Sequence, residues 1–220
     1  MPKVTLEALD LAALLCSRVC HDVISPVGAI VNGLEVLDDE KDPAMREFAF
    51  ELIAKSSKQA SARLQFARIA FGAAGSKGAE IDLGDAEQIA RGMFQDDKTT
   101  LSWEAPRILM PKNKVKLLLN MLMLATGTIP RGGSISVTVT DDGQNSEFVV
   151  LCKGSHARIP PHVEELIAGE PESGTVDAHG IQPYFTGLVA RESAMAVAFT
   201  LQDDSVTITA KTIEQTPDKK

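Results

Sequence analysis

A histidine next to an aspartate, with a proline shortly after, is the part of this sequence that could do chemistry. His21 and Asp22 are neighbours in RVCHDVISPVGAI (18–30). Near neutral pH an exposed imidazole is largely unprotonated and can act as a nucleophile, and a phosphoryl group is a suitable electrophile for it. Asp22 cannot share the helix face of His21, but it can reach a ring nitrogen. The pair indicates phosphoryl transfer through His21, and a hydrogen-bonded packing histidine is the plainer alternative.

Pro26 follows five residues after the histidine, inside an apolar pattern typical of a helix. Proline has no N–H, so the carbonyl of Asp22 loses its helical donor, which costs about 3 kcal/mol in a helix interior. We expect the helix to bend there. A bend would expose the imidazole to a docking partner, and packing inside a bundle is the other possible reason for it.

The face of the helix that carries His21 predicts a docking surface. Its residues one and two turns away are small or polar, which lets a partner's helix approach closely. The predicted docking residues are Ser17, Ser25, Gly28 and Asn32, with Arg18 and Ala29 flanking. A solvated bundle face is the alternative.

A metal site is the other chemistry to weigh at this position. Cys16 and Cys20 are one helical turn apart, and His21 comes next. No fourth ligand follows at zinc-like spacing, so we predict no metal here. We expect both thiols to pack as small apolar side chains.

Composition limits the possible partners. The 220 residues carry a net charge of −8, which argues against nucleic acid, because phosphate binding depends on Lys and Arg. The sequence contains no run of 18 consecutive apolar residues, so we expect no membrane-spanning helix. Three cysteines without framework spacing indicate free thiols in a reducing cytoplasm.

Two long helices must position the histidine. Apolar periodicity predicts one helix over residues 5–39 and another over 44–71, with Pro43 in its first turn. Their apolar stripes are too wide for one partner helix, so we expect two such hairpins to form a dimeric four-helix bundle. The Gly-rich stretch 72–78 is the best domain boundary, which gives a first domain of residues 1–72.

Residues 79–213 predict a second domain with helices on one face of a mostly antiparallel sheet, an α/β two-layer sandwich. We expect helices at 83–94, 113–125, 160–167 and 182–195, and strands at 99–103, 134–140, 146–153, 196–202 and 205–210. The tail TPDKK looks disordered.

These residues carry a family resemblance. LLCSRVCHDVISPVGAI (14–30) resembles the phosphoacceptor box of two-component histidine kinases, and the hairpin resembles their dimerisation and phosphotransfer domain. By this resemblance His21 is the phosphoacceptor and Asp22 assists the transfer. The second domain is similar to the ATP-binding (Bergerat-type) domain of the same kinases.

The nucleotide chemistry of that domain is missing. Leu124 stands where the kinases have an asparagine for Mg²⁺, and only Asn120 survives one turn earlier. Gly154 replaces the aspartate that reads adenine, and His156 and Arg158 replace glycines. Leucine cannot coordinate a hard cation, and Arg158 would fill the room that a glycine leaves. The nearest remnant of a phosphate loop is TGL (186–188). We therefore expect no ATP binding.

A phosphotransfer hairpin joined to such a degenerate domain resembles the ChpT-type histidine phosphotransferases of the alphaproteobacterial cell-cycle phosphorelay. The resemblance covers nearly the whole chain, including GIQPYFTGLVARE (180–192). It implies a cytoplasmic homodimer that passes a phosphoryl group from the receiver of a CckA-like hybrid kinase to CtrA-like and CpdR-like response regulators. It also implies that the receivers bring the Mg²⁺.

Three alternatives stay open. One is an ATP-dependent sensor kinase, against which the changes at Leu124, Gly154, His156 and Arg158 speak. Another is a non-catalytic receiver-binding module, against which His21 speaks. The third is a monomeric phosphotransfer domain, which is expected to have a Lys-Gly pair after its histidine, where this chain has DVISP.

Overall fold

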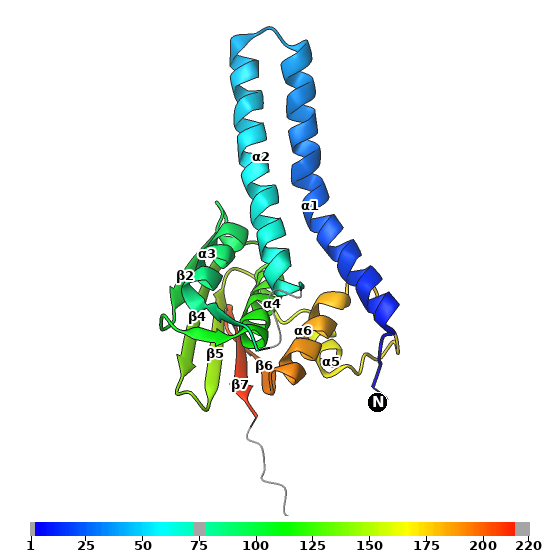
Figure 1. The fold of residues 1–220 in the computed structure, drawn as a ribbon, viewed down its shortest axis with the longest axis vertical. Coiled ribbons are helices and arrows are strands. Elements are labelled where there is room, and N and C mark those ends of the chain that lie inside the picture. Colours follow the sequence, from blue (N-terminus) through cyan, green and yellow to red (C-terminus); the bar gives the residue numbers. More distant parts are fainter. Residues whose placement is uncertain (1–2, 73–77, 214–220) are drawn as a thin grey trace, which may run out of the picture.

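The computed structural model describes residues 3–72 and 78–213. A hairpin of two long helices, α1 (Ala8–Asp39) and α2 (Pro43–Ala70), extends away from a layer of strands and shorter helices (Figure 1). Both predicted helices are confirmed to within a few residues, and Pro43 begins α2, where its missing N–H costs no helical hydrogen bond. The predicted 72–78 linker includes residues 73–77, which lie outside the described residues, as does the tail TPDKK.

The two helices approach closely at Gly33. A Cβ atom there would lie 2.6 Å from Cγ1 of Ile53 and 3.3 Å from the carbonyl oxygen of Ala49. Towards its N-terminus α1 diverges from α2 and reaches the α/β layer (Figure 1). Leu11 and Leu15 pack there against the large core. Part of the apolar stripe that we assigned to a bundle therefore belongs to the contact between the hairpin and the α/β layer.

Along the rest of α1 an apolar face has no cover within the chain. Ile24 is 70% exposed and Leu34 is 50% exposed. Cys16 and Cys20 lie on this face, since they precede Ile24 at intervals of four residues, and both are exposed. The apolar packing that we expected for these two thiols is not provided by this chain itself, because α2 covers a different face of α1.

By length and composition α1 could cross a membrane, with a mean hydropathy of 1.4 over an 18-residue window. A bundle helix near the N-terminus passes the same test. Arg18 and Asp22 lie well inside α1, where a membrane span would have to bury their charges at a cost of several kcal/mol each. This helix alone therefore gives no reason to place the protein in a membrane.

The α/β layer contains a five-stranded sheet in the order β2-β4-β5-β7-β6. β2 is parallel to β4 and the other neighbours are antiparallel. The strands are β2 (Thr99–Glu104), β4 (Gly133–Asp141), β5 (Ser146–Lys153), β6 (Met195–Gln202) and β7 (Ser205–Thr212). The predicted strands are confirmed. A separate antiparallel pair, β1 (Glu80–Asp82) and β3 (Leu109–Pro111), was not predicted.

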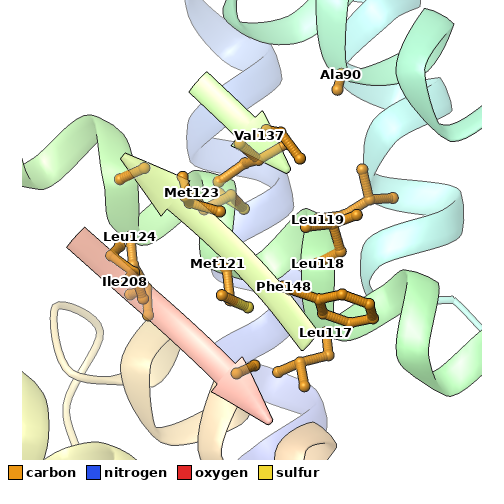
Figure 2. Close-up of a cluster of buried hydrophobic side chains, with 14 of the residues drawn as sticks. Ala90, Leu117, Leu118, Leu119, Met121, Met123, Leu124, Val137, Phe148 and Ile208 are labelled. Atoms are coloured by element: carbon orange, nitrogen blue, oxygen red, sulfur yellow. The ribbon is translucent and has the colours of Figure 1, made fainter. Parts of the chain in front are cut away.

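Within the described residues four helices accompany the sheet, as predicted. They are α3 (Leu83–Phe94), α4 (Lys112–Thr128), α5 (Val163–Ala168) and α6 (Ile181–Glu192). α4 is buried on nearly all sides between the sheet and its neighbours. Figure 2 shows Leu117 and Leu118 of α4 near Phe148 of β5, and Leu124 of α4 near Ile208 of β7. Each such side chain contributes about 1.5–3 kcal/mol on burial, so α4 is the centre of the core.

Besides the packing of α2 on α3, hydrogen bonds hold the hairpin to this layer at both ends of the hairpin's chain. At the end of α2, the carbonyl of Ala70 accepts a 3.0 Å hydrogen bond from Nδ2 of Asn120. Near the N-terminus, the hydroxyl of Tyr184 donates to the carbonyl of Val4 (3.1 Å) and accepts from the N–H of Leu6 (3.2 Å). The histidine helix is therefore held directly at its N-terminal end. It is also held indirectly, through the C-terminal end of α2.

Candidate active site

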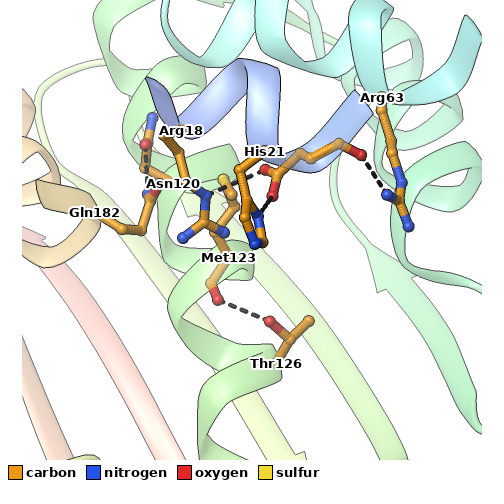
Figure 3. Close-up of polar contacts among 8 residues, drawn as sticks. Arg18, His21, Arg63, Asn120, Met123, Thr126 and Gln182 are labelled. Atoms are coloured by element: carbon orange, nitrogen blue, oxygen red, sulfur yellow. Dashed lines mark hydrogen bonds and ion pairs between the residues drawn. The ribbon is translucent and has the colours of Figure 1, made fainter. Parts of the chain in front are cut away.

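His21 is presented to solvent on α1, with 84% of its side chain exposed. Its Nδ1 atom lies 3.3 Å from Oδ1 of Asp22. The other carboxylate oxygen of Asp22 accepts a 3.1 Å hydrogen bond from Nε of Arg18, one turn earlier (Figure 3). The Asp22 side chain is only 19% exposed, so its carboxylate is held between a guanidinium and the imidazole.

Pro26 is buried inside α1. The carbonyl of Asp22, which this proline leaves without a helical donor, accepts a hydrogen bond from Nη1 of Arg63 on α2 (Figure 3). The missing donor was predicted from the sequence. The replacement from the second helix was not, because nothing in the sequence links position 63 to position 22.

The structure places the predicted docking residues on the side of α1 that bears His21. Ser17, Ser25 and Asn32 are exposed, and Arg18, Gly28 and Ala29 are half-buried. Gly28 has open space above it, since an added Cβ would meet no atom within 4 Å. The packing of this chain therefore does not require a glycine at position 28.

His21 opens onto a groove of about 550 Å³ between the hairpin and the α/β layer. His21, Asp22 and Ser25 line one side. Residues that sequence reasoning missed complete the lining, among them Arg63, Lys98, Met93, Met123 and Thr126. They come from α2, α3, α4 and the loop before β2, so only the fold brings them to the histidine. With Arg18, the described lining of the groove holds three permanent cations, against the two carboxylates of Asp22 and Asp96.

Comparisons with known proteins point to one family. A family model described as the histidine phosphotransferase C-terminal domain matches residues 83–205. The protein phosphotransferase ChpT of Brucella abortus (strain 2308) is 50% identical over 208 residues, 94% of this chain and 98% of that protein. The chain belongs to the histidine phosphotransferase family. A solved structure of a bacterial phosphotransferase is 48% identical, with a TM-score of 0.86 over 96% of this chain and 100% of that one.

This histidine phosphotransferase uses for its own packing several of the positions at which the sequence predicted a lost nucleotide site. Asn120 is fully buried, and its amide group donates to the carbonyls of Ala70 and Lys116 (3.0 and 2.8 Å). Leu124 is 7% exposed and belongs to the core. At Gly154 a Cβ would lie 2.4 Å from the carbonyl oxygen of Gly132. The turn after β5 therefore needs a glycine there.

His156 and Arg158, which we expected to stand in place of glycines of the kinases, both lie at the surface of the phosphotransferase. His156 has a left-handed φ of 66° and its Nδ1 lies 3.3 Å from Nη1 of Arg131. Arg158 is exposed, and the expectation that it fills vacated space inside the domain is wrong. The backbone N–H of Arg158 donates a hydrogen bond to the carbonyl of Thr128 (3.0 Å), and its side chain points to solvent. The TGL remnant lies within α6, where a Cβ on Gly187 would meet the carbonyl oxygen of Ile167 at 2.0 Å.

A second cavity of about 740 Å³ lies between α4, α5 and the segment leading to α6. Leu124 and Pro160 are among its apolar residues, and Glu165, Glu172 and Asp177 bring three carboxylates to it. The backbone N–H of Gly180 donates to Asp177 (2.8 Å) and lowers the pKa of that carboxyl below its usual range, so it stays charged. The α/β layer of this phosphotransferase thus offers a cavity lined by three carboxylates, with Arg18 of α1 as the one permanent cation among the described residues that line it.

Within the described residues, one group of side chains has donor atoms close enough for a shared metal ion, within 4.8 Å of one another: His162, Glu165 and Glu172. Nδ1 of His162 already pairs with Glu165 at 3.3 Å. Exposed acidic residues commonly form such groups without binding a metal. Cys16, Cys20 and His21 are not in this group, and the predicted lack of a metal at the histidine remains a prediction.

Proposed function

We propose that His21 accepts a phosphoryl group from the receiver-domain aspartate of a CckA-like hybrid kinase and passes it to receiver aspartates of CtrA-like and CpdR-like response regulators. The single observation that carries the proposal is an exposed imidazole that lies 3.3 Å from the mostly buried carboxylate of Asp22 and opens onto the groove between the hairpin and the α/β layer. The 50% identity to a protein phosphotransferase ChpT supports it.

The contact with Asp22 selects the attacking nitrogen. With its proton on Nδ1, the imidazole donates to Asp22 and leaves the lone pair of Nε2 free. Nε2 attacks phosphorus, the N–P bond forms, and the bond to the receiver's aspartate oxygen breaks so that the aspartate leaves as a carboxylate. The imidazole becomes positively charged, and the carboxylate of Asp22 stabilises that charge. Attack by a second receiver's aspartate reverses these steps.

The cations of the groove suit an anionic group in transit. Lys98 comes from the α/β layer and Arg18 from α1, and both line the groove that His21 enters. Fixed positive charge near the transferring phosphoryl group lowers the energy of the transition state. The receiver brings the Mg²⁺ that its own aspartate requires, and the chain needs no metal of its own.

The docking surface comprises Ser17, Ser25, Gly28 and Asn32, flanked by Arg18 and Ala29. A glycine in a helix interior destabilises the helix by about 0.5–1 kcal/mol relative to alanine. Because nothing in this chain lies within 4 Å of a Cβ at Gly28, the benefit of the glycine falls to a partner. A receiver helix seated there would cover both the glycine and His21.

The functional form is a homodimer whose hairpins, residues 1–72, form a four-helix bundle. The apolar residues exposed on the hairpin include Ile24, Val27, Val31, Leu34, Met45, Phe48 and Leu64. Monomeric proteins seldom expose so many large apolar side chains on neighbouring elements. A second copy would cover the faces that α1 and α2 leave open.

The decisive experiment follows a labelled phosphoryl group from a phosphorylated receiver to the purified chain and on to a second receiver. His21→Ala should abolish both steps and leave the melting temperature nearly unchanged, because the side chain is 84% exposed. Asp22→Asn should slow transfer by about 10²-fold or more without abolishing it.

The other histidines provide the controls. His156→Ala, His162→Ala and His179→Ala should transfer like the wild type, because all three lie in the α/β layer away from the groove at His21. An acid-labile label that stays on the His21→Ala protein would place the phosphoacceptor elsewhere and overturn the proposal.

A further inference from the structure

The hydrogen bond from Arg63 to the carbonyl of Asp22 joins the two helices at the phosphoacceptor turn. An unpaired carbonyl in a helix is costly when it is shielded from water, and Pro26 creates one at Asp22. Arg63 is half-buried on α2, and its Nη1 supplies the missing donor from 41 residues further along the chain. A charged donor makes a stronger hydrogen bond than a neutral one.

Asp22 is therefore fixed by both its main chain and its side chain. Its carbonyl is bound by Arg63, and its carboxylate is bound by Arg18 and lies 3.3 Å from the imidazole of His21. Figure 3 shows the guanidinium groups of Arg18 and Arg63 on opposite sides of His21. With its main chain fixed, Asp22 has fewer ways to turn its carboxylate away from the histidine.

We propose that Arg63 is a positioning residue for phosphoryl transfer: by replacing the donor that Pro26 removes, it fixes the turn from which Asp22 orients His21. The proposal rests on the proposed function of His21. Arg63 also lines the groove, so direct contact with the phosphoryl group is the competing role that the experiment must separate. A positioning residue acts through Asp22 and needs only a hydrogen-bond donor, whereas a phosphate ligand acts on the substrate itself.

The first measurement compares Arg63→Met with Arg63→Lys in transfer from a phosphorylated receiver at increasing receiver concentration. Arg63→Met should lower the maximal rate by about 10–100-fold, because small misplacements of reacting groups are costly. The receiver concentration at half-maximal rate should change little. Arg63→Lys keeps a donor and should stay within about threefold of the wild type. Arg68→Met is the matched control, since Arg68 is exposed on the same helix and does not line the groove.

A double-mutant cycle with Pro26→Ala separates the two roles. Alanine at position 26 restores the N–H that donates to the carbonyl of Asp22, so Arg63 should lose its function there. Pro26→Ala/Arg63→Met should therefore transfer no more slowly than Pro26→Ala alone. Losses that multiply would show that Arg63 acts on the phosphoryl group, and an Arg63→Met protein as fast as the wild type would show that it has no role. Either result overturns the proposal.

Folding and the proposed function are checked separately. The folding of each variant is checked by its melting temperature and its mass in solution. If Arg63→Met does not fold, Arg63→Lys provides the test. An Arg63→Lys protein that folds but transfers more than about tenfold slower than the wild type contradicts a role that needs only a donor. If the wild type takes no phosphoryl group on His21, the proposed function fails. The NMR shifts of the His21 ring still test Arg63: they should move in Arg63→Met and stay in Arg68→Met, and unmoved shifts in both overturn the inference.

Discussion

Oδ1 of Asn120 accepts a 2.8 Å hydrogen bond from Nε2 of Gln182, deep between α4 and α6. The amide nitrogen of the same Asn120 binds the carbonyl of Ala70 at the end of α2. One buried side chain thus connects three helices, including the one that supports the histidine helix. Its oxygen is committed to this contact and is not offered to a metal ion.

Replacing Asn120 with leucine should destabilise the fold. The change leaves the amide of Gln182 and the carbonyl of Ala70 without partners, at a cost of about 1–3 kcal/mol for each buried polar group. Urea unfolding should show the loss, whereas Asn113→Ala, near the start of the same helix, should shift stability by less than about 0.5 kcal/mol. An unchanged midpoint for Asn120→Leu would contradict the structural role.

The chain should not bind Mg·ATP. Leu124 offers no oxygen to the metal. The carboxylates of Glu165, Glu172 and Asp177 outnumber Arg18, the one permanent cation among the described residues around the cavity, and would repel a triphosphate. Calorimetry at millimolar nucleotide should show no saturable heat. A micromolar dissociation constant would bring back the sensor-kinase alternative.

Light scattering at micromolar concentration should give twice the chain mass of 23.5 kDa. Charges placed on the exposed apolar face of the hairpin, as in Leu34→Glu/Phe48→Glu, should give monomers, because a dimer would bury them unpaired. Leu201→Glu, equally exposed but on β6, should remain dimeric. A wild-type protein of single-chain mass contradicts the bundle.

We expect Gly28 to lower the stability of the hairpin and to allow a receiver to approach closely. Gly28→Gln should stabilise the hairpin by about 0.5–1 kcal/mol, because nothing obstructs its side chain, and it should slow transfer from a receiver at least about tenfold by blocking close approach. Gly33→Ala is the contrasting variant, since its Cβ would lie 2.6 Å from Ile53, and it should lower the melting temperature. Fast transfer by Gly28→Gln would remove Gly28 from the docking surface.

Stability should fall above pH 9 through Cys152. Burial raises the pKa of this thiol from 9.0 to about 11, and a hydrogen bond with Thr128 opposes this rise only in part. Between these values the unfolded chain ionises and the folded chain does not, so about 2–3 kcal/mol of stability is lost as pH rises. Denaturant midpoints from pH 8 to 11 should show a shallower decline for Cys152→Ala. Equal slopes would contradict the burial effect.

The spacing of apolar residues predicted most helices and strands, because each of these segments is long enough to show a helical or an alternating period. α3 matches its predicted range of 83–94, and the hairpin of β4 and β5 follows an alternating pattern through Val137 and Val150, which pair in the sheet. β1 and β3 have three residues each, too few to establish a period. The apolar residues near the start of α1 looked like bundle residues, because the sequence cannot say which surface a stripe faces.

The candidate site was predictable only where its residues are neighbours in the chain. His21, Asp22 and Pro26 lie within one and a half helical turns, and their types alone indicated the chemistry. Arg63 and Lys98 reach the groove through tertiary packing. Exposed cations are common in any sequence, and without the fold nothing distinguishes these two from the rest.

The hydrogen bonds between Tyr184 and the N-terminal segment limit how the α/β layer can move relative to α1. A domain that itself phosphorylates a histidine has to swing between its nucleotide and that histidine. Here such a swing would have to break the hydrogen bonds at Val4 and Leu6, or the one from Asn120 to Ala70 at the opposite attachment. We therefore expect the α/β layer to keep its position beside His21. A receiver that docks at His21 would then meet a surface of constant shape, and transfer would need no hinge motion of this layer.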